Sequence, residues 1–73
     1  MRDETQLVKE EGVVEEALPG LLFRVVLAGR DGYVLAHLGG KLKLHRIRVI
    51  PGDRVVVEMS RAGDERGRIV RRL

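Results

Sequence analysis

The chain has 73 residues, of which 34% are charged, no cysteine, and a formal net charge of +3 at pH 7. A chain of this length forms one domain, whose single core leaves a stability margin of only about 3–5 kcal/mol. The lack of cysteine excludes disulfides, a thiolate metal site and a thiol nucleophile, and it fits a reducing, cytoplasmic location. The charged amino end leads into no apolar segment of signal-peptide or membrane-spanning length, so we expect neither export nor membrane insertion.

The charge is divided unevenly along the chain. Residues 1–38 carry 4 basic and 7 acidic side chains, net −3, whereas residues 39–73 carry 10 basic and 4 acidic ones, net +6. A sign asymmetry of this kind indicates a nucleic acid or an anionic membrane as partner. The sequence contains no long basic amphipathic helix with aromatic residues on its apolar face, so the pattern favours a nucleic acid.

The amino-terminal part predicts a long first strand over residues 6–17, preceded by a flexible end at residues 1–5. β-Branched pairs stand among acids in this stretch, although its Glu, Leu and Ala residues also allow a helix. Gly12 inside the strand pattern indicates a bulge or a sharp bend, which a strand needs if it is to serve two parts of a closing barrel.

Two further strands form a predicted hairpin. Leu18-Pro19-Gly20-Leu21 places Pro and Gly at the second and third positions of a type II turn. Period-2 alternation then predicts strands over residues 21–27 and 33–38, joined by a loop over residues 28–32. The predicted inward positions are Leu21, Phe23, Val25, Leu27, Val34, Ala36 and Leu38. The opposite face, a candidate binding platform, carries Arg24, Tyr33, Leu35 and His37.

The stretch from Gly39 to Gly52 is both basic and aliphatic. It holds four cations within eight residues and no acid. We expect a loop or short helix that aliphatic side chains hold on the domain while the cations face an anion such as a phosphate backbone. The cations are Lys41, Lys43, Arg46 and Arg48, and the predicted anchors are Leu42, Leu44, Ile47, Val49 and Ile50.

Two strands complete the predicted domain. A second Pro-Gly turn, at residues 51–52, begins a strand over residues 54–59, and the polar, glycine-containing residues 60–67 predict a loop. A last strand covers residues 68–73. The predicted inward positions are Val55, Val57 and Met59, and the last strand carries Arg68, Arg71 and Arg72.

Five strands with an insertion between the third and the fourth predict an all-β domain of the OB-fold class, a Greek-key barrel with a short helix or loop in that place. OB-folds hold oligonucleotides on their second and third strands and on two flanking loops. A five-stranded SH3-like barrel is the main alternative, but an insertion of this length and character is not expected between its third and fourth strands. The whole chain, residues 1–73, is predicted to be one S1-like RNA-binding domain.

Catalytic and metal motifs are weak in this sequence. Gly40-Lys41 lacks the earlier glycine and the following Ser or Thr of a phosphate-binding loop. His37 and His45 stand eight residues apart with no cysteine nearby, which makes a poor metal site. The single Ser and the single Thr have no context of an activated nucleophile. We therefore expect a protein that is not an enzyme and that binds no metal or cofactor.

Aromatic residues for stacking on bases are scarce. Only Phe23 and Tyr33 are present, and Phe23 is predicted to lie in the core. A generic single-strand binder that relies on base stacking is therefore disfavoured. Recognition of folded RNA through phosphates, ribose hydroxyls and shape suits the residues better.

A set of short segments stands in a specific order and spacing over nearly the whole chain. The segments are Glu11-Gly12-Val13-Val14, Leu18-Pro19, Phe23-Arg24-Val25, Ala36-His37-Leu38, Gly40-Lys41, Ile47-Arg48-Val49, Pro51-Gly52-Asp53-Arg54-Val55 and Gly67-Arg68-Ile69-Val70. Together they resemble the bacterial translation initiation factor one family. The resemblance implies an OB-fold monomer that binds ribosomal RNA of the small ribosomal subunit at the decoding (A) site. There it would block premature tRNA access and act with other initiation factors.

The resemblance also implies site residues. Lys41, Lys43, Arg48 and Arg68 match positions associated with ribosomal RNA contact, and His37 with Gly40 matches the corner between the third strand and the insertion. The remaining RNA-binding candidates are Arg46, Arg66, Arg71 and Arg72. Arg46 and Arg71 stand where aromatics are common in the family, and Arg61-Ala62-Gly63 stands where a Pro-Tyr-Asp turn is often found, so this chain exchanges stacking for charge.

The expected mode of action is occupancy without catalysis. Lysines and arginines on phosphates would fix the position of the domain, and the body of the domain would exclude a tRNA. Two alternatives stay open at this point. One is a general RNA-binding or RNA chaperone protein, and the other is a protein–protein adaptor that uses Tyr33, Leu35 and the acidic first strand.

Overall fold

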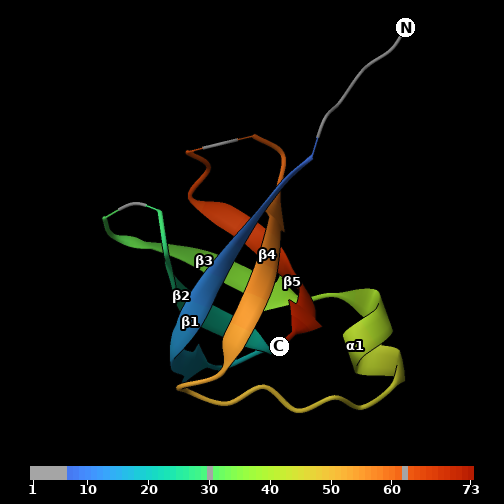
Figure 1. Ribbon diagram of the computed structural model, residues 1–73. Coiled ribbons are helices and arrows are strands. Elements are labelled where there is room, and N and C mark those ends of the chain that lie inside the picture. Colours follow the sequence, from blue (N-terminus) through green and yellow to red (C-terminus); the bar gives the residue numbers. More distant parts are fainter. Residues whose placement is uncertain (1–6, 30, 62) are drawn as a thin grey trace, which may run out of the picture.

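The computed structural model describes residues 7–29, 31–61 and 63–73 as five strands and one short helix (Figure 1). The elements are β1 (Val8–Leu18), β2 (Leu22–Leu27), β3 (Tyr33–Leu38), α1 (Gly40–Leu44), β4 (Arg54–Met59) and β5 (Arg66–Arg72). Every predicted strand is present, and α1 occupies the predicted insertion between β3 and β4. The predicted flexible end at residues 1–5 lies outside the described residues, as do Gln6, Arg30 and Ala62.

The strands close into a barrel in the order β1-β2-β3-β5-β4. All neighbouring strands are antiparallel except β3 and β5, which run parallel. β1 pairs with β4 along its first part and with β2 along its second part, so one long strand belongs to both walls, as predicted. Figure 1 shows β1 and β4 side by side, with α1 at one end of the barrel. The closed order and the place of α1 confirm the OB-fold.

The bulge in β1 does not lie at Gly12, where the sequence pattern predicted it. The register with β2 shifts between Val14 and Glu16. Gly12 itself is paired with both neighbouring strands, and a Cβ there would lie 2.6 Å from the carbonyl oxygen of Val26. Gly12 therefore permits a close approach between β1 and β2, which is a different use of a strand glycine.

The barrel interior is filled by aliphatic side chains and one aromatic ring, that of Phe23. The predicted inward positions of the strands are buried except Leu21, which is 51% exposed. Leu21 has a φ of 57° and continues the turn after Gly20, whose φ is 80°, so β2 begins one residue later than predicted. The buried core consists of Val14, Phe23, Val25, Leu27, Val34, Ala36, Leu38, Leu42, Val49, Val55, Val57, Met59 and Ile69.

Both ends of the insertion are fastened to the barrel by backbone hydrogen bonds. The N–H of Gly39 donates to the carbonyl of Ile69 at 2.8 Å, next to the start of α1. At the other end, the N–H of Gly52 donates to the carbonyl of Val14 at 2.8 Å. The insertion is therefore held between β5 and β1, the two strands that bracket the chain.

Only part of the predicted aliphatic anchoring is found. Leu42 and Val49 are buried, and Ile47 packs against the core, as expected. Leu44 and Ile50 are 76% and 50% exposed, so their predicted role as anchors is wrong. A helix of only five residues directs one face to the barrel, and Leu42 alone occupies that face.

α1 ends in a tight reversal at Arg46. The N–H of Ile47 donates to the carbonyl of Leu42 at 2.9 Å, and the N–H of Arg46 donates to that of Lys43 at 3.1 Å. This pair of bonds is the Schellman motif, in which the residue with positive φ is usually glycine. Here Arg46 takes that position, with a φ of 55°. The sequence therefore places a cation where the backbone favours glycine.

β5 begins two residues earlier than predicted. Arg66 pairs with Leu35 in the parallel ladder between β3 and β5, so residues 66 and 67 belong to the strand instead of the loop. A Cβ at Gly67 would lie 2.6 Å from Cγ1 of Val57. The glycine thus allows β5 to run close to β4, and this places Arg66 and Arg68 on the wall of the barrel.

Candidate nucleic-acid interface

Four ionisable side chains form one cross-strand row on the outer wall of the barrel. Lys9 of β1 faces Glu58 of β4, which faces Arg68 of β5. Arg68 in turn faces His37 of β3. Directly opposed side chains on neighbouring strands lie within contact range of one another. The row joins two predicted residues, Arg68 and His37, with Lys9, which no sequence pattern indicates because it stands alone among acids in the first strand.

A hollow of about 580 Å³ opens between α1 and this row. We call it the α1 hollow. Cations reach it from three separate elements, β1, α1 and β5, and Glu58 is the one acid among the described residues that line it. Its charged residues are Lys9, Lys41, Glu58, Arg68 and Arg71, and Gly40 also lines it. Three predicted cations and the predicted Gly40 are thereby brought together.

A second hollow, of about 360 Å³, lies on the other side of the row, and we call it the β3–β5 hollow. Its charged and polar lining includes His37 and Arg66, beside Glu58 and Arg68. Glu58 and Arg68 line both hollows. Glu58 and Arg68 therefore lie between two cationic hollows on one wall of the barrel.

The pair itself is a charge-assisted hydrogen bond from Nη2 of Arg68 to Oε1 of Glu58. The side chain of Glu58 is 12% exposed, whereas that of Arg68 is 48% exposed. The guanidinium group has five N–H donors, so its outer donors remain available to a ligand. Within the described residues, no other predicted RNA-binding cation forms an ion pair with a carboxylate.

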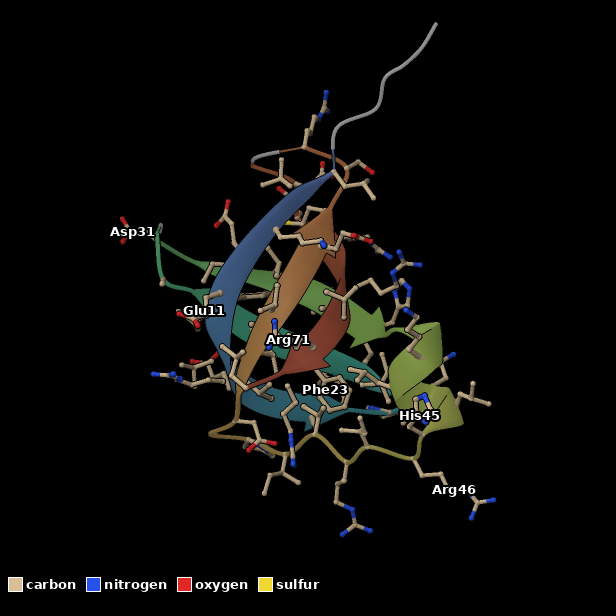
Figure 2. The ribbon with its side chains drawn as sticks, turned by 45° about the vertical axis from the view of Figure 1, so that its right-hand side comes forward. Glu11, Phe23, Asp31, His45, Arg46 and Arg71 are labelled. Atoms are coloured by element: carbon tan, nitrogen blue, oxygen red, sulfur yellow. The ribbon has the colours of Figure 1, made fainter. Side chains whose placement is uncertain are left out.

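Lys43, Arg46 and Arg48 line a third hollow, of about 370 Å³, which we call the insertion hollow. Its floor is apolar and includes Phe23 and Leu42. Leu42 lines the α1 hollow as well, so α1 stands between the two. Figure 2 shows His45 and Arg46 at the end of the molecule that carries α1, with Arg46 directed away from the barrel. The cations of the basic insertion therefore form one cluster in the sequence but line two neighbouring hollows in the structure.

The opposite side of the molecule is acidic and partly apolar. In Figure 2, Glu11 and Asp31 lie on the side away from His45 and Arg46. Arg24, on the predicted hairpin platform, is engaged by two neighbouring side chains. Its Nη1 lies 3.1 Å from Oε1 of Glu16, and its Cζ lies 4.7 Å from the ring centroid of Tyr33. The hairpin platform is thus divided, because His37 lies in the basic row whereas Arg24 is engaged by Glu16 and Tyr33.

The fold and the surface together define a class of protein, namely small OB-fold barrels whose outer wall carries clustered cations. The chain also matches a known protein family over nearly its whole length. The chain belongs to the family described as Translation initiation factor 1A / IF-1, whose model matches residues 2–73. Members of this family are non-enzymatic translation factors, and association with RNA and the ribosome follows from membership.

Solved structures show the same similarity. One is the solution structure of translation initiation factor one from the Wolbachia endosymbiont strain TRS of Brugia malayi, at 43% sequence identity and a TM-score of 0.73. The match covers 92% of this chain and 78% of that one. A second is the crystal structure of YjeQ from Thermotoga maritima, at 25% identity and a TM-score of 0.72. That match covers 90% of this chain but 23% of YjeQ, so the similarity is confined to a part of the larger protein.

The helix content adds one further finding. In the part of the chain that the structure describes, no helix has both the length and the apolar character needed to cross a membrane.

Proposed function

We propose that this protein binds the small ribosomal subunit at its decoding (A) site through ribosomal RNA. Bound there as a monomer, it blocks premature tRNA access and cooperates with other initiation factors. Its action is occupancy without catalysis. Family membership supports the assignment to initiation, and the cationic hollows support the mode of contact.

The observation that carries this proposal is the convergence of four cations on the α1 hollow. Lys9, Lys41, Arg68 and Arg71 come from three elements that are far apart in sequence. The closed barrel holds their backbones at fixed distances, so the surface presents a rigid pattern of charge. A rigid pattern of cations suits folded RNA, whose phosphates keep a fixed spacing, better than it suits a flexible single strand.

The insertion hollow adds a second set of contacts. Lys43, Arg46 and Arg48 surround its apolar floor at the end of the barrel next to α1. Phosphate contacts of this kind determine register and orientation without reading a base sequence. The barrel body then stands over the site on the RNA, and a tRNA cannot occupy the same volume.

The test is a chemical footprint on purified small subunits with and without the protein, combined with affinity measured at several salt concentrations. If about five of the cations in the three hollows contact a phosphate at one time, the slope of log affinity against log salt is about −4. The control for both measurements is Arg61→Ala, which removes a cation that the proposal does not use. Arg61 is exposed and lies in the loop between β4 and β5, so this variant should behave like the wild type. A slope near zero, or protection outside the decoding site, contradicts the proposal. Equal affinity for unrelated RNA indicates a general RNA chaperone instead.

A second candidate function, that of a protein–protein adaptor, is favoured by one feature of the acidic side. Val13, Val26 and Tyr33 are directly opposed across β1, β2 and β3 and are 43%, 38% and 49% exposed. Such an apolar row, with Glu11 and Asp31 on the same side, suits a protein partner. Capture of a purified initiation factor in the presence of nuclease, without small subunits, distinguishes the adaptor from an RNA-bound factor.

A further inference from the structure

We infer that Glu58 determines the RNA selectivity of this surface by keeping a negative charge between two cationic hollows. The inference rests on the proposed function, which is binding to ribosomal RNA, and it assigns a role to an acid inside a basic site. RNA whose phosphates lie on either side of Glu58 is admitted, and RNA that must pass a phosphate over Glu58 is disfavoured.

The position of Glu58 is the first support. It stands between Lys9 and Arg68 in the cross-strand row, and it lines both the α1 hollow and the β3–β5 hollow. Among the described residues that line these two hollows, it is the only carboxylate. Every other ionisable group of the lining is a Lys, an Arg or His37, so Glu58 is the single charge of either lining that repels a phosphate passing over it.

The low exposure of Glu58 is the second support. Its side chain is 12% exposed and bonded to Arg68, so the carboxylate cannot turn away into solvent when a phosphate approaches. Arg68 is 48% exposed and reaches both hollows, so it can bond a phosphate on either side while it keeps its bond to Glu58. The pair therefore attracts phosphates at its edges and repels them at its centre.

This arrangement distinguishes two kinds of RNA. A flexible strand that runs from one hollow to the other carries its phosphates continuously past the carboxylate. A folded RNA can place phosphates from two separate segments in the two hollows and leave the space over Glu58 free. Like charges arranged against the wrong partner are a general means of specificity.

The experiment compares the wild-type protein with Glu58→Gln for binding to purified small subunits and to poly(U). Because Gln removes the charge and keeps the shape, we expect affinity for poly(U) to rise about fivefold, as for loss of one close like-charge contact near water. We expect affinity for small subunits to change less than about twofold, since the folded RNA avoids the carboxylate. The ratio of the two affinities is the readout.

The matched control is Glu16→Gln. Glu16 is also a carboxylate paired with an arginine, Arg24, but it lines none of the three hollows. Glu16→Gln makes the same change in net charge as Glu58→Gln. Because Glu16 does not stand between the two hollows, the ratio of the two affinities should stay unchanged. An equal gain for both RNAs, or the same gain in Glu16→Gln, shows an effect of net charge alone and overturns the inference. Weaker binding to both RNAs by Glu58→Gln shows that Glu58 only orients Arg68, and this also overturns it.

Glu58→Asp separates charge from geometry and provides a second test if the Gln variant folds poorly. It keeps the negative charge and shortens the reach to Arg68, so wild-type selectivity is expected. Loss of selectivity in Glu58→Asp contradicts a role for charge. Failure of the proposed function is seen separately, because the wild-type protein would then bind small subunits no better than poly(U).

Discussion

Arg72 donates from Nη1 to the carbonyl oxygen of Arg48 at 3.1 Å, across 24 positions of sequence. This bond joins the end of β5 to the insertion beyond α1. It engages two residues that the sequence predicts as RNA contacts, but it uses the side chain of Arg72 and the backbone of Arg48. Arg48 keeps its own side chain at the insertion hollow, whereas Arg72 is partly structural.

Arg72→Ala should therefore cost stability as well as charge. Loss of one hydrogen bond of this kind is expected to lower the free energy of unfolding by about 1 kcal/mol, as measured by urea denaturation. Arg71→Ala is the matched control, because it removes the same charge from the neighbouring position of β5. If the two variants unfold at the same urea concentration, the bond to Arg48 contributes nothing measurable.

Arg46→Gly should stabilise the protein while it weakens RNA binding. Arg46 has a φ of 55° at the end of α1, where a side chain is strained and glycine is not, so a gain of about 1 kcal/mol is expected in thermal unfolding. The same change removes a cation from the insertion hollow, so affinity for small subunits should fall. Arg48→Gly is the control, since Arg48 does not have a positive φ and its replacement should not stabilise.

The adjacent glycines Gly39 and Gly40 should respond in opposite ways to alanine. A Cβ at Gly39 would lie 2.6 Å from the carbonyl oxygen of Ile69, so Gly39→Ala should destabilise by about 2 kcal/mol or more. A Cβ at Gly40 would meet nothing within 4 Å, and alanine favours a helix, so Gly40→Ala should be neutral or slightly stabilising. Chemical denaturation of both variants checks this, and equal losses would refute it.

Gly40→Ala also tests the RNA contact predicted for Gly40. Because the variant is expected to fold normally, lower affinity for small subunits would show that RNA approaches the backbone of Gly40 closely at the α1 hollow. Unchanged affinity would remove Gly40 from the interface without affecting the role of the neighbouring cations.

Lys41→Ala combined with Arg48→Ala should weaken binding without unfolding the domain. The two side chains line different hollows and form no ion pair with a described carboxylate, so stability should stay within about 0.5 kcal/mol of wild type. Each substitution should reduce the magnitude of the salt slope by about 1, and the two effects should add. An unfolded double variant would show that these residues support the structure instead.

Much of the fold could be predicted from local patterns. Alternating apolar residues in β2, β3 and β4 predicted both the strands and nearly all of their buried positions. In a strand, alternate residues lie on the same face, so period-2 patterning shows which face is buried. Pro-Gly turns and the loss of alternation after Leu38 predicted the insertion and its place. The errors fall where local pattern carries no information. Leu44 and Ile50 are aliphatic yet exposed, and Glu15 rather than Gly12 occupies the irregular position of β1.

The sequence by itself determined the strands, the place of the basic insertion and the excess of cations in the second half, because each depends on residues close together in the chain. Only the tertiary structure decided which charges are neighbours. The pairing of β4 with both β1 and β5 sets Glu58 between Lys9 and Arg68, and the placement of α1 brings Lys41 to a different hollow from Arg48. These relations depend on the register between strands that are distant in sequence, and register follows from closing the barrel around its core.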